Sequence, residues 1–363
     1  MDSGLYVHVP FCVRKCGYCA FFSRPAEPGL VAAWFAGIER ELAALPAGCA
    51  PTSVFFGGGT PTALEESELA RLVDLVRARV DLRNVAEWTC EANPGTLAPA
   101  KLAQLKRGGV NRLSIGAQSF GDETLKRLGR IHGADDVRAA VAQARAAGFD
   151  NVGLDLIYGV PGASRKSFEA DVEAAVALAP EHLSCYCLEI EEGTPFARLA
   201  AAGKLAVSEE EQRAQFDWAR KRLAAGGWEH YEISNFAKPG RACRQNLLYW
   251  SGGEYIGIGP AAHSHWAGAR WGNSAELPEW KRAFEEKLEP EAKARETLVM
   301  GLRRLGGWSR SEFRAATGFD LDALRGKEIQ KLARQGLLVV DSARIRLAEE
   351  ALFVSDSVFA ELI

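Results

Sequence analysis

The chain has 363 residues, 47% hydrophobic and 25% charged, which is typical of a globular protein with one large domain and a smaller one. Its 44 Lys and Arg residues nearly balance 47 Asp and Glu residues, and a net charge of −3 argues against binding to nucleic acid or anionic lipid. The sequence starts without the basic and apolar pattern of a secretory signal, and no run approaches the ~18 apolar residues of a membrane span. We therefore expect a cytoplasmic protein without a transmembrane segment.

The first 190 residues alternate between β-rich and amphipathic helical runs. The predicted strands are residues 5–9, 53–56, 87–91, 112–115, 152–157 and 183–190. The predicted helices between them are residues 31–44, 66–80, 99–107, 134–147 and 167–179. This alternation is typical of parallel strands joined by crossover helices, so we predict an α/β fold, a full or partial (β/α)6 barrel of TIM type. In such barrels the functional residues lie at the carboxyl ends of the strands.

The pattern changes after a predicted helix at residues 209–225. An aromatic and glycine-rich stretch follows, and residues 290–363 then show three helices and a short hairpin, a winged-helix-like α+β arrangement. The charge of this last segment is mixed, which favours a structural or partner-docking role over DNA binding. We predict a barrel core at residues 1–230, an aromatic and glycine-rich extension at 231–289 and a C-terminal domain at 290–363.

Three of the eight cysteines lie close together, on the loop that follows the first predicted strand. Cys12, Cys16 and Cys19 have the spacing C-x3-C-x2-C, and the next alternate position is Phe21. Three thiolates can hold an iron–sulfur cubane with one iron open, whereas structural zinc sites and ordinary ferredoxin clusters use four ligands. A zinc site completed by His8 is the alternative, which its position within the predicted strand disfavours. The other cysteines are scattered among apolar residues and read as buried side chains.

The cysteine spacing resembles that of the radical S-adenosylmethionine (radical SAM) enzymes. The resemblance implies a [4Fe-4S] cluster on the three cysteines, with the methionine part of S-adenosylmethionine (SAM) chelating the open iron. In that family an electron from the cluster cleaves the sulfonium bond, so an electron donor of the flavodoxin or ferredoxin type is implied. The sequence leaves open whether SAM is turned over, and we assign no catalytic residue.

The same resemblance assigns residues on successive strand ends to SAM binding. The glycine-rich segment after the second strand would hold the methionine amino group, Arg130 its carboxylate, and Asp155 the ribose hydroxyls. His8 and His132, beside these motifs, are interpreted as structural hydrogen-bonding residues. The full predicted set is Tyr6, Tyr18, Gly58, Gly59, Thr60, Glu91, Gln118, Arg130, Asp155 and Glu189.

Longer motifs resemble the oxygen-independent coproporphyrinogen III oxidase group. They include Tyr-x-His-x-Pro-Phe-Cys from Tyr6 and Asp-Leu-Ile-Tyr-Gly-x-Pro-Gly from Asp155. The group contains true oxidases, with a fourth cysteine and a longer N-terminal arm, and haem-binding proteins regarded as haem chaperones. Phe21 replaces the fourth cysteine and only five residues precede Tyr6, so the haem-chaperone branch is the better match.

One segment departs from that branch. Its His-Asn-x-x-Tyr-Trp motif, associated with haem, has Gln245 in place of histidine here, and an amide is a poor ligand for haem iron. Nearby iron-ligand candidates are Cys243, His263 and His265, although all three could simply pack. The predicted haem residues are Cys243, Asn246, Tyr249, Trp250, His263 and His265.

Two functions follow from the resemblance. The first is a haem chaperone that binds haem and delivers it to acceptor proteins. The alternative is a radical SAM oxidoreductase that decarboxylates coproporphyrinogen III or a related substrate.

Overall fold

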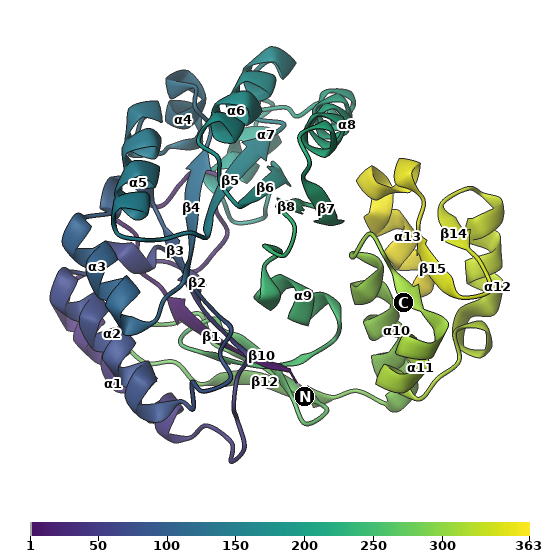
Figure 1. Ribbon diagram of the computed structural model, residues 1–363, viewed down its shortest axis with the longest axis horizontal. Coiled ribbons are helices and arrows are strands. Elements are labelled where there is room, and N and C mark those ends of the chain that lie inside the picture. Colours follow the sequence, from purple (N-terminus) through teal and green to yellow (C-terminus); the bar gives the residue numbers. More distant parts are fainter. Residues whose placement is uncertain (1) are drawn as a thin grey trace.

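The computed structural model describes residues 2–363, so Met1, the first residue of the predicted barrel segment, lies outside the described residues (Figure 1). Its first six strands are β1 (Ser3–Val9), β2 (Ser53–Gly58), β3 (Glu87–Ala92), β4 (Arg112–Gln118), β5 (Val152–Tyr158) and β6 (His182–Cys187). The helices of this part are α1 (Pro28–Ala43), α2 (Glu66–Arg79), α3 (Pro99–Gly108), α4 (Asp122–Leu128), α5 (Ala134–Ala146), α6 (Arg165–Ala177), α7 (Pro195–Ala201) and α8 (Glu209–Ala225). Short 3-10 helices, η1 (Pro61–Ala63) and η2 (Pro94–Thr96), follow β2 and β3. The predicted α/β order is confirmed.

Strands β1 to β6 pair in parallel and in chain order, as the (β/α) pattern predicts. In the β1–β2 pair, for example, Leu5 lies opposite Val54 and Val9 opposite Gly58. The carboxyl ends of all six strands therefore meet at one end of the curved sheet, where the loops that contain the predicted SAM residues begin.

Alternation along β1 separates the two faces of the sheet. Leu5, Val7 and Val9 are fully buried in the main hydrophobic core, whereas Tyr6 and His8 lie on the opposite face, toward the barrel interior. Helices α1 to α6 cover the outer side of the curved sheet (Figure 1). Helix α1 is fixed to the central strand because Trp34 Nε1 donates to the His8 carbonyl oxygen at 3.1 Å. Each fully buried aliphatic side chain in this layer contributes about 1.5–3 kcal/mol to stability.

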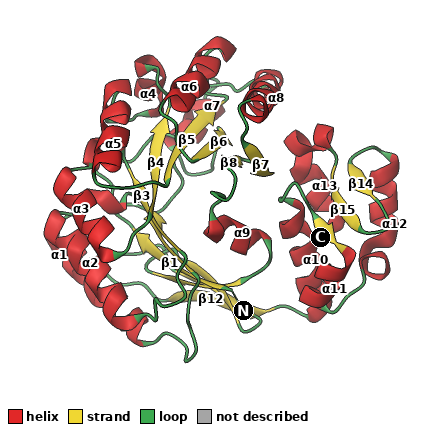
Figure 2. Cartoon of the chain, in the orientation of Figure 1, coloured by secondary structure: helices red, strands yellow, loops and turns green. Residues whose placement is uncertain are grey.

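The aromatic and glycine-rich stretch extends both edges of this sheet. Its elements are β7 (Glu229–Glu232), β8 (Asn235–Ala237), α9 (Arg244–Trp250), β9 (Glu254–Ile258), β10 (His263–Trp266), β11 (Ala269–Asn273) and β12 (Arg282–Lys287). Strand β8 joins β6, and β9 joins β1, giving the strand order β12-β11-β10-β9-β1-β2-β3-β4-β5-β6-β8-β7. Helix α9 lies on the inner side of the sheet (Figure 2). The sequence did not predict these strands, because they are short and lack a regular alternation.

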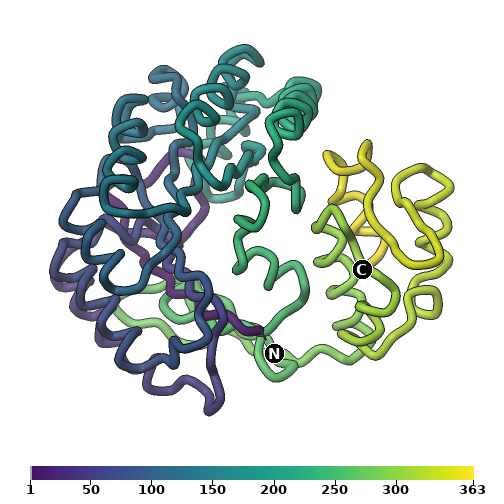
Figure 3. The backbone as a smooth tube through the Cα atoms, viewed as in Figure 1, coloured from purple at the N-terminus to yellow at the C-terminus, as the bar shows by residue number. Residues whose placement is uncertain are grey.

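The C-terminal domain is a separate lobe that the chain enters after β12 (Figure 3). It contains α10 (Pro290–Leu302), β13 (Trp308–Ser309), α11 (Arg310–Thr317), α12 (Leu321–Arg334), β14 (Leu338–Val340), β15 (Arg344–Leu347), η3 (Glu349–Val354) and α13 (Ser355–Leu362). The three helices and the hairpin agree with the prediction, while β13 and α13 are additional. Backbone hydrogen bonds from Ile233 to Arg303 and from Leu305 to Tyr231 join this domain to the sheet.

Among residues 2–363, no helix combines the length and the apolar character that crossing a bilayer requires.

Candidate functional site

The three clustered cysteines lie on one loop, directly after β1. The loop is closed at its base by hydrogen bonds from Cys12 N to the Arg24 carbonyl oxygen, at 3.0 Å, and from Arg24 N to the Pro10 carbonyl oxygen, at 2.7 Å. Farther along, Gly17 N donates to the carbonyl oxygen of Leu128, the last residue of α4, at 3.3 Å. These bonds hold the cysteines over the carboxyl ends of the strands.

The donor set of this loop fits a cubane cluster. Cys12, Cys16 and Cys19 are all free thiols, and Cys16 is only 8% exposed. In a cubane each cysteine binds a different iron, so the three sulfur atoms need not meet at one point. This agrees with the finding that no three His, Cys, Asp or Glu side chains within residues 2–363 converge on a single metal ion. His8 is not a ligand candidate, because its ring bonds to Tyr6 Oη and the Phe22 carbonyl oxygen.

The glycine-rich segment after β2 packs directly on the cysteine loop. Gly59 N donates to the Val9 carbonyl oxygen at 2.9 Å, and Thr60 N to the Phe11 carbonyl oxygen at 2.7 Å. A side chain at position 59 would place its Cβ 2.7 Å from that Phe11 oxygen, so only glycine allows this approach. The Thr60 hydroxyl lies 3.5 Å from Cys12 Sγ. The predicted glycine segment and cysteine loop are therefore neighbours in the fold.

Two carboxylates face the barrel interior beside this loop. Glu91, on β3, accepts a hydrogen bond from Gly58 N at 3.2 Å. Burial, together with the nearby Asp155 carboxylate, raises the pKa of Glu91 to about 8. On β5, Asp155 accepts hydrogen bonds from Ser184 at 2.7 Å and Ser114 at 3.2 Å. Burial also raises the pKa of Asp155 above its ordinary value. The oxygens of these carboxyl groups can accept hydrogen bonds from ammonium and hydroxyl groups of a ligand, and a ligand ammonium would favour the ionised form of Glu91.

Arg130 brings a positive charge to the same place. Its Nη1 lies 3.5 Å from Cys16 Sγ, and its Nη2 donates to the Gly116 carbonyl oxygen at 2.8 Å. A Cβ at Gly116 would lie 2.8 Å from Gln118 Nε2 and 3.3 Å from Arg130 Nη2, so both side chains lie against the same side of this glycine. Gln118 has a φ of 66°, so its backbone turns sharply at the end of β4. The fold thus brings Gln118 and Arg130 to the cysteine loop.

Three other predicted SAM residues differ in how they are placed. The Tyr6 ring stacks on Phe55 inside the barrel, with centroids 6.1 Å apart. Tyr18, on the cysteine loop, lies against Phe196. Glu189 was expected to end the sixth strand, but β6 ends at Cys187. Burial raises the pKa of Glu189. The charged groups that also affect this pKa are Glu191, Asp356 and Arg303, and none of them belongs to the predicted set.

Several polar residues of the barrel interior were not among the predicted site residues. Ser114 and Ser184 donate hydrogen bonds to the Asp155 carboxylate. Arg112, on β4, is 1% exposed, and its positive charge partly offsets the burial that raises the pKa of Glu91 and of Asp155. Their signal was a polar residue within an otherwise apolar strand. A short apolar run predicts a strand but does not show which of its side chains face the barrel interior.

The predicted haem segment lies at the opposite end of the barrel. Gln245 is 1% exposed, and its Oε1 accepts a hydrogen bond at 2.7 Å from Ser53, the first residue of β2. Cys243 is equally buried, with its Sγ 3.5 Å from an oxygen of Glu87, the first residue of β3. Burial raises the pKa of the Cys243 thiol to about 12. Both side chains are therefore buried against the amino ends of the strands.

The remaining predicted haem residues do not form one group. Asn246 Nδ2 donates to Tyr231 Oη at 3.4 Å, and Trp250 lies beneath the guanidinium of Arg303 at 4.5 Å. His263 is exposed, whereas Tyr249 and His265 line a pocket against the C-terminal domain. The structure thus separates these residues into buried, exposed and pocket-lining positions.

Comparison with known proteins finds relatives that match nearly the whole chain. The sequence model of the radical SAM superfamily matches residues 6–175, and that of the HemN C-terminal domain matches residues 288–354. A relative from Bacillus subtilis, named heme chaperone HemW, is 34% identical over 98% of this chain and 97% of its own. The chain belongs to the HemW family of radical SAM proteins. The HemW protein of Escherichia coli K12 is 40% identical over 71% of this chain and 69% of its own.

A solved structure supports the fold of this HemW family member. The coproporphyrinogen III oxidase HemN of Escherichia coli, described as a radical SAM enzyme, superposes with a TM-score of 0.85. The match covers 99% of this chain and 90% of HemN at 22% identity, so it shows a shared fold. The predicted membership of the radical SAM superfamily and of the haem-chaperone branch is confirmed. HemW family membership implies a [4Fe-4S] cluster and SAM, which the donor set at the cysteine loop fits.

Proposed function

We propose that this protein is a haem chaperone, which binds haem and transfers it to acceptor proteins in the cytoplasm. The observation that carries the proposal is the 34% identity to a protein named heme chaperone HemW over 98% of the chain. The match includes the sheet extension and the C-terminal domain, so it is not limited to the cysteine loop.

Cys12, Cys16 and Cys19 would hold the cluster in this proposal, and Arg130, Glu91 and Asp155 would position SAM beside it. When bound, the cluster supplies one-electron chemistry and an open iron for the methionine group of SAM. The chain itself supplies a guanidinium for a carboxylate and two interior carboxylates for ammonium and hydroxyl groups. An electron donor of the flavodoxin or ferredoxin type would dock near the cysteine loop.

The test is haem binding and transfer by the full chain without a histidine tag, after anaerobic reconstitution. We expect a stable haem complex that passes haem to an apo-haemoprotein, such as apomyoglobin, faster than free haem in the presence of a competing scavenger. Coproporphyrinogen III, with SAM and a reductant, should stay intact when analysed by mass spectrometry. Decarboxylated product, together with 5′-deoxyadenosine, would instead support the oxidoreductase alternative.

A further inference from the structure

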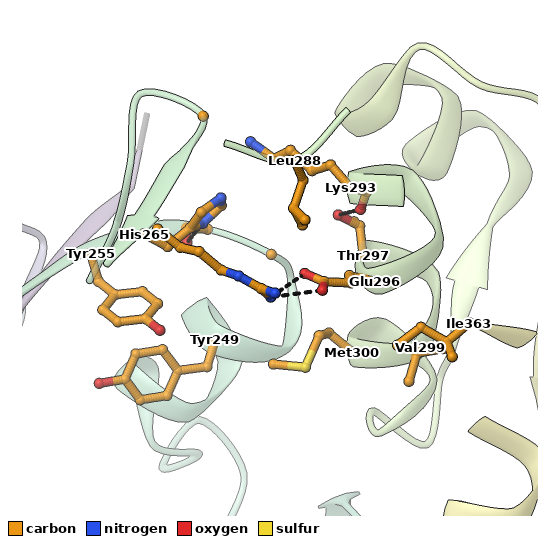
Figure 4. A pocket seen from close by; sticks show the side chains of 14 residues that line it. Tyr249, Tyr255, His265, Leu288, Lys293, Glu296, Thr297, Val299, Met300 and Ile363 are labelled. Carbon is orange, nitrogen blue, oxygen red and sulfur yellow. Dashed lines mark hydrogen bonds and ion pairs between the residues drawn. The ribbon is translucent and has the colours of Figure 1, made fainter. Parts of the chain in front are cut away.

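A pocket of about 300 Å³ lies between the extended sheet edge and the first helix of the C-terminal domain (Figure 4). Side chains from α9, β9, β10 and β11 form one wall, and side chains from α10 form the other. The lining residues that matter here are Tyr249, Tyr255, His265, Arg270, Lys293 and Met300. None of them belongs to the cysteine-loop site, so the pocket is a second place where a ligand could bind.

His265 has a free lone pair in this pocket. Its Nδ1 lies 3.1 Å from the Gly253 carbonyl oxygen, and a carbonyl oxygen can only accept a hydrogen bond. Nδ1 must therefore hold the proton, which leaves the lone pair on Nε2. Burial lowers the pKa of His265, which favours this neutral form. A backbone carbonyl that fixes one ring nitrogen in this way is the usual support of a metal-binding histidine.

The rest of the pocket suits a flat, apolar ligand, and Lys293 offers a positive charge for an acidic group of that ligand. Tyr249 and Tyr255 pack edge to face, with centroids 4.6 Å apart, and the side chain of Met300 lies across from them on α10 (Figure 4). Arg270 pairs with Glu286 and, at 2.7 Å, with Glu296, so its charge is neutralised within the protein. The pair with Glu296 links the sheet to the C-terminal domain.

The other iron-ligand candidates, and Gln245 at the position of the family histidine, have no comparable position. His263 lies on the same strand, two residues before His265, but it is exposed and packs near Phe284, with ring centroids 5.6 Å apart. Cys243 and Gln245 are each 1% exposed and lie under the amino ends of the barrel strands. Of these four residues, His265 alone lines the pocket.

We infer that this pocket binds one side of an iron porphyrin and that His265 Nε2 is a ligand of the iron. The inference rests on the proposed haem-chaperone function and adds the binding site. About 300 Å³ is at the lower end of the ~300–1,000 Å³ range of ligand pockets, so most of a tetrapyrrole would stay outside. A partly exposed haem would remain accessible to the protein that receives it.

The test is a haem titration of the untagged full chain and of two histidine variants, followed in the Soret region. His265→Ala should bind haem at least about tenfold more weakly, because even the outer-shell partners of a metal ligand contribute about 10–100-fold to affinity. Its spectrum should lose the histidine-ligated band, and added imidazole should restore that band by filling the space left by the ring. His263→Ala is the matched control on the same strand and should behave like the unaltered protein.

Two other outcomes separate the inference from the proposed function. If the unaltered protein binds haem and His265→Ala shows the same affinity and spectrum, the pocket assignment is wrong while the chaperone proposal stands. If the unaltered protein does not bind haem, both fail. Cluster absorbance and circular dichroism of each variant, compared with the unaltered protein, establish that His265→Ala is folded.

Discussion

Arg130 and Cys16 connect two loops that are far apart in the sequence. Nη1 of Arg130 lies 3.5 Å from Cys16 Sγ, while Nη2 donates to the Gly116 carbonyl oxygen at 2.8 Å. The buried Nε of Arg130 has no hydrogen-bond partner within the described part of the chain. An unpaired buried donor costs about 1–3 kcal/mol, and the guanidinium charge beside the cysteine loop suits a ligand carboxylate.

Replacing Arg130 should weaken SAM binding. In Arg130→Lys the charge stays but the planar fork is lost, and we expect about 10–100-fold lower affinity, the equivalent of one charge-assisted hydrogen bond. Calorimetric titration with SAM, on protein with matched cluster content, measures the effect. Arg127→Lys is the control, since Arg127 is exposed and bonds to the Pro161 carbonyl oxygen. Equal SAM affinity in Arg130→Lys and the unaltered protein would remove Arg130 from the site.

The cluster should depend on the three loop cysteines and on no other cysteine. A variant with Cys12, Cys16 and Cys19 all replaced by Ala should lose the broad iron–sulfur absorbance and the bound iron after anaerobic reconstitution. Cys49→Ala should keep both, because Cys49 is half-buried in the segment before β2 and is not one of the three loop cysteines. A cluster that persists in the triple variant would contradict the assignment.

Glu91 should make stability depend on pH. In the unfolded chain a glutamate ionises near ~4.3, whereas burial raises the pKa of Glu91 to about 8 in the native protein. Between these pH values the native state binds more protons, so this residue's contribution to the free energy of unfolding falls as pH rises. The amide of Glu91→Gln does not ionise in this pH range. The free energy of unfolding of this variant, relative to that of the unaltered protein, should therefore increase from pH 5 to pH 8. Urea unfolding of the cluster-free proteins measures this difference, and a constant difference would show that Glu91 is already ionised at pH 5.

Gln245 should affect stability and not haem binding. Gln245→Ala leaves the Ser53 hydroxyl without its partner inside the protein, which should lower the free energy of unfolding by about 1–3 kcal/mol. Gln330→Ala, on the exposed side of α12, should change it by less than about 0.5 kcal/mol. Haem affinity should be unchanged in Gln245→Ala. Weaker haem binding in a folded Gln245→Ala variant would contradict this and place Gln245 in the haem site.

The sequence alone was sufficient for the barrel and for the cysteine loop. Both depend on local patterns: strands that alternate with amphipathic helices, and cysteines spaced so that one loop presents three thiols. The predicted residues Gly59, Thr60, Glu91 and Arg130 come together because parallel strands bring their carboxyl ends to one edge. Glu189 was placed less well, because the end of β6 has no clear signal in the sequence.

Only the tertiary structure decided the arrangement of the segment from Cys243 to His265. Strand β9 pairs with β1, where Ser3 lies opposite Glu254, and no local pattern can encode a contact between such distant residues. That pairing buries Gln245 and Cys243 beneath the barrel and leaves His265 in the pocket beside α10. The sequence therefore determined the chemistry available to this protein, and long-range packing decided which side chains can reach a ligand.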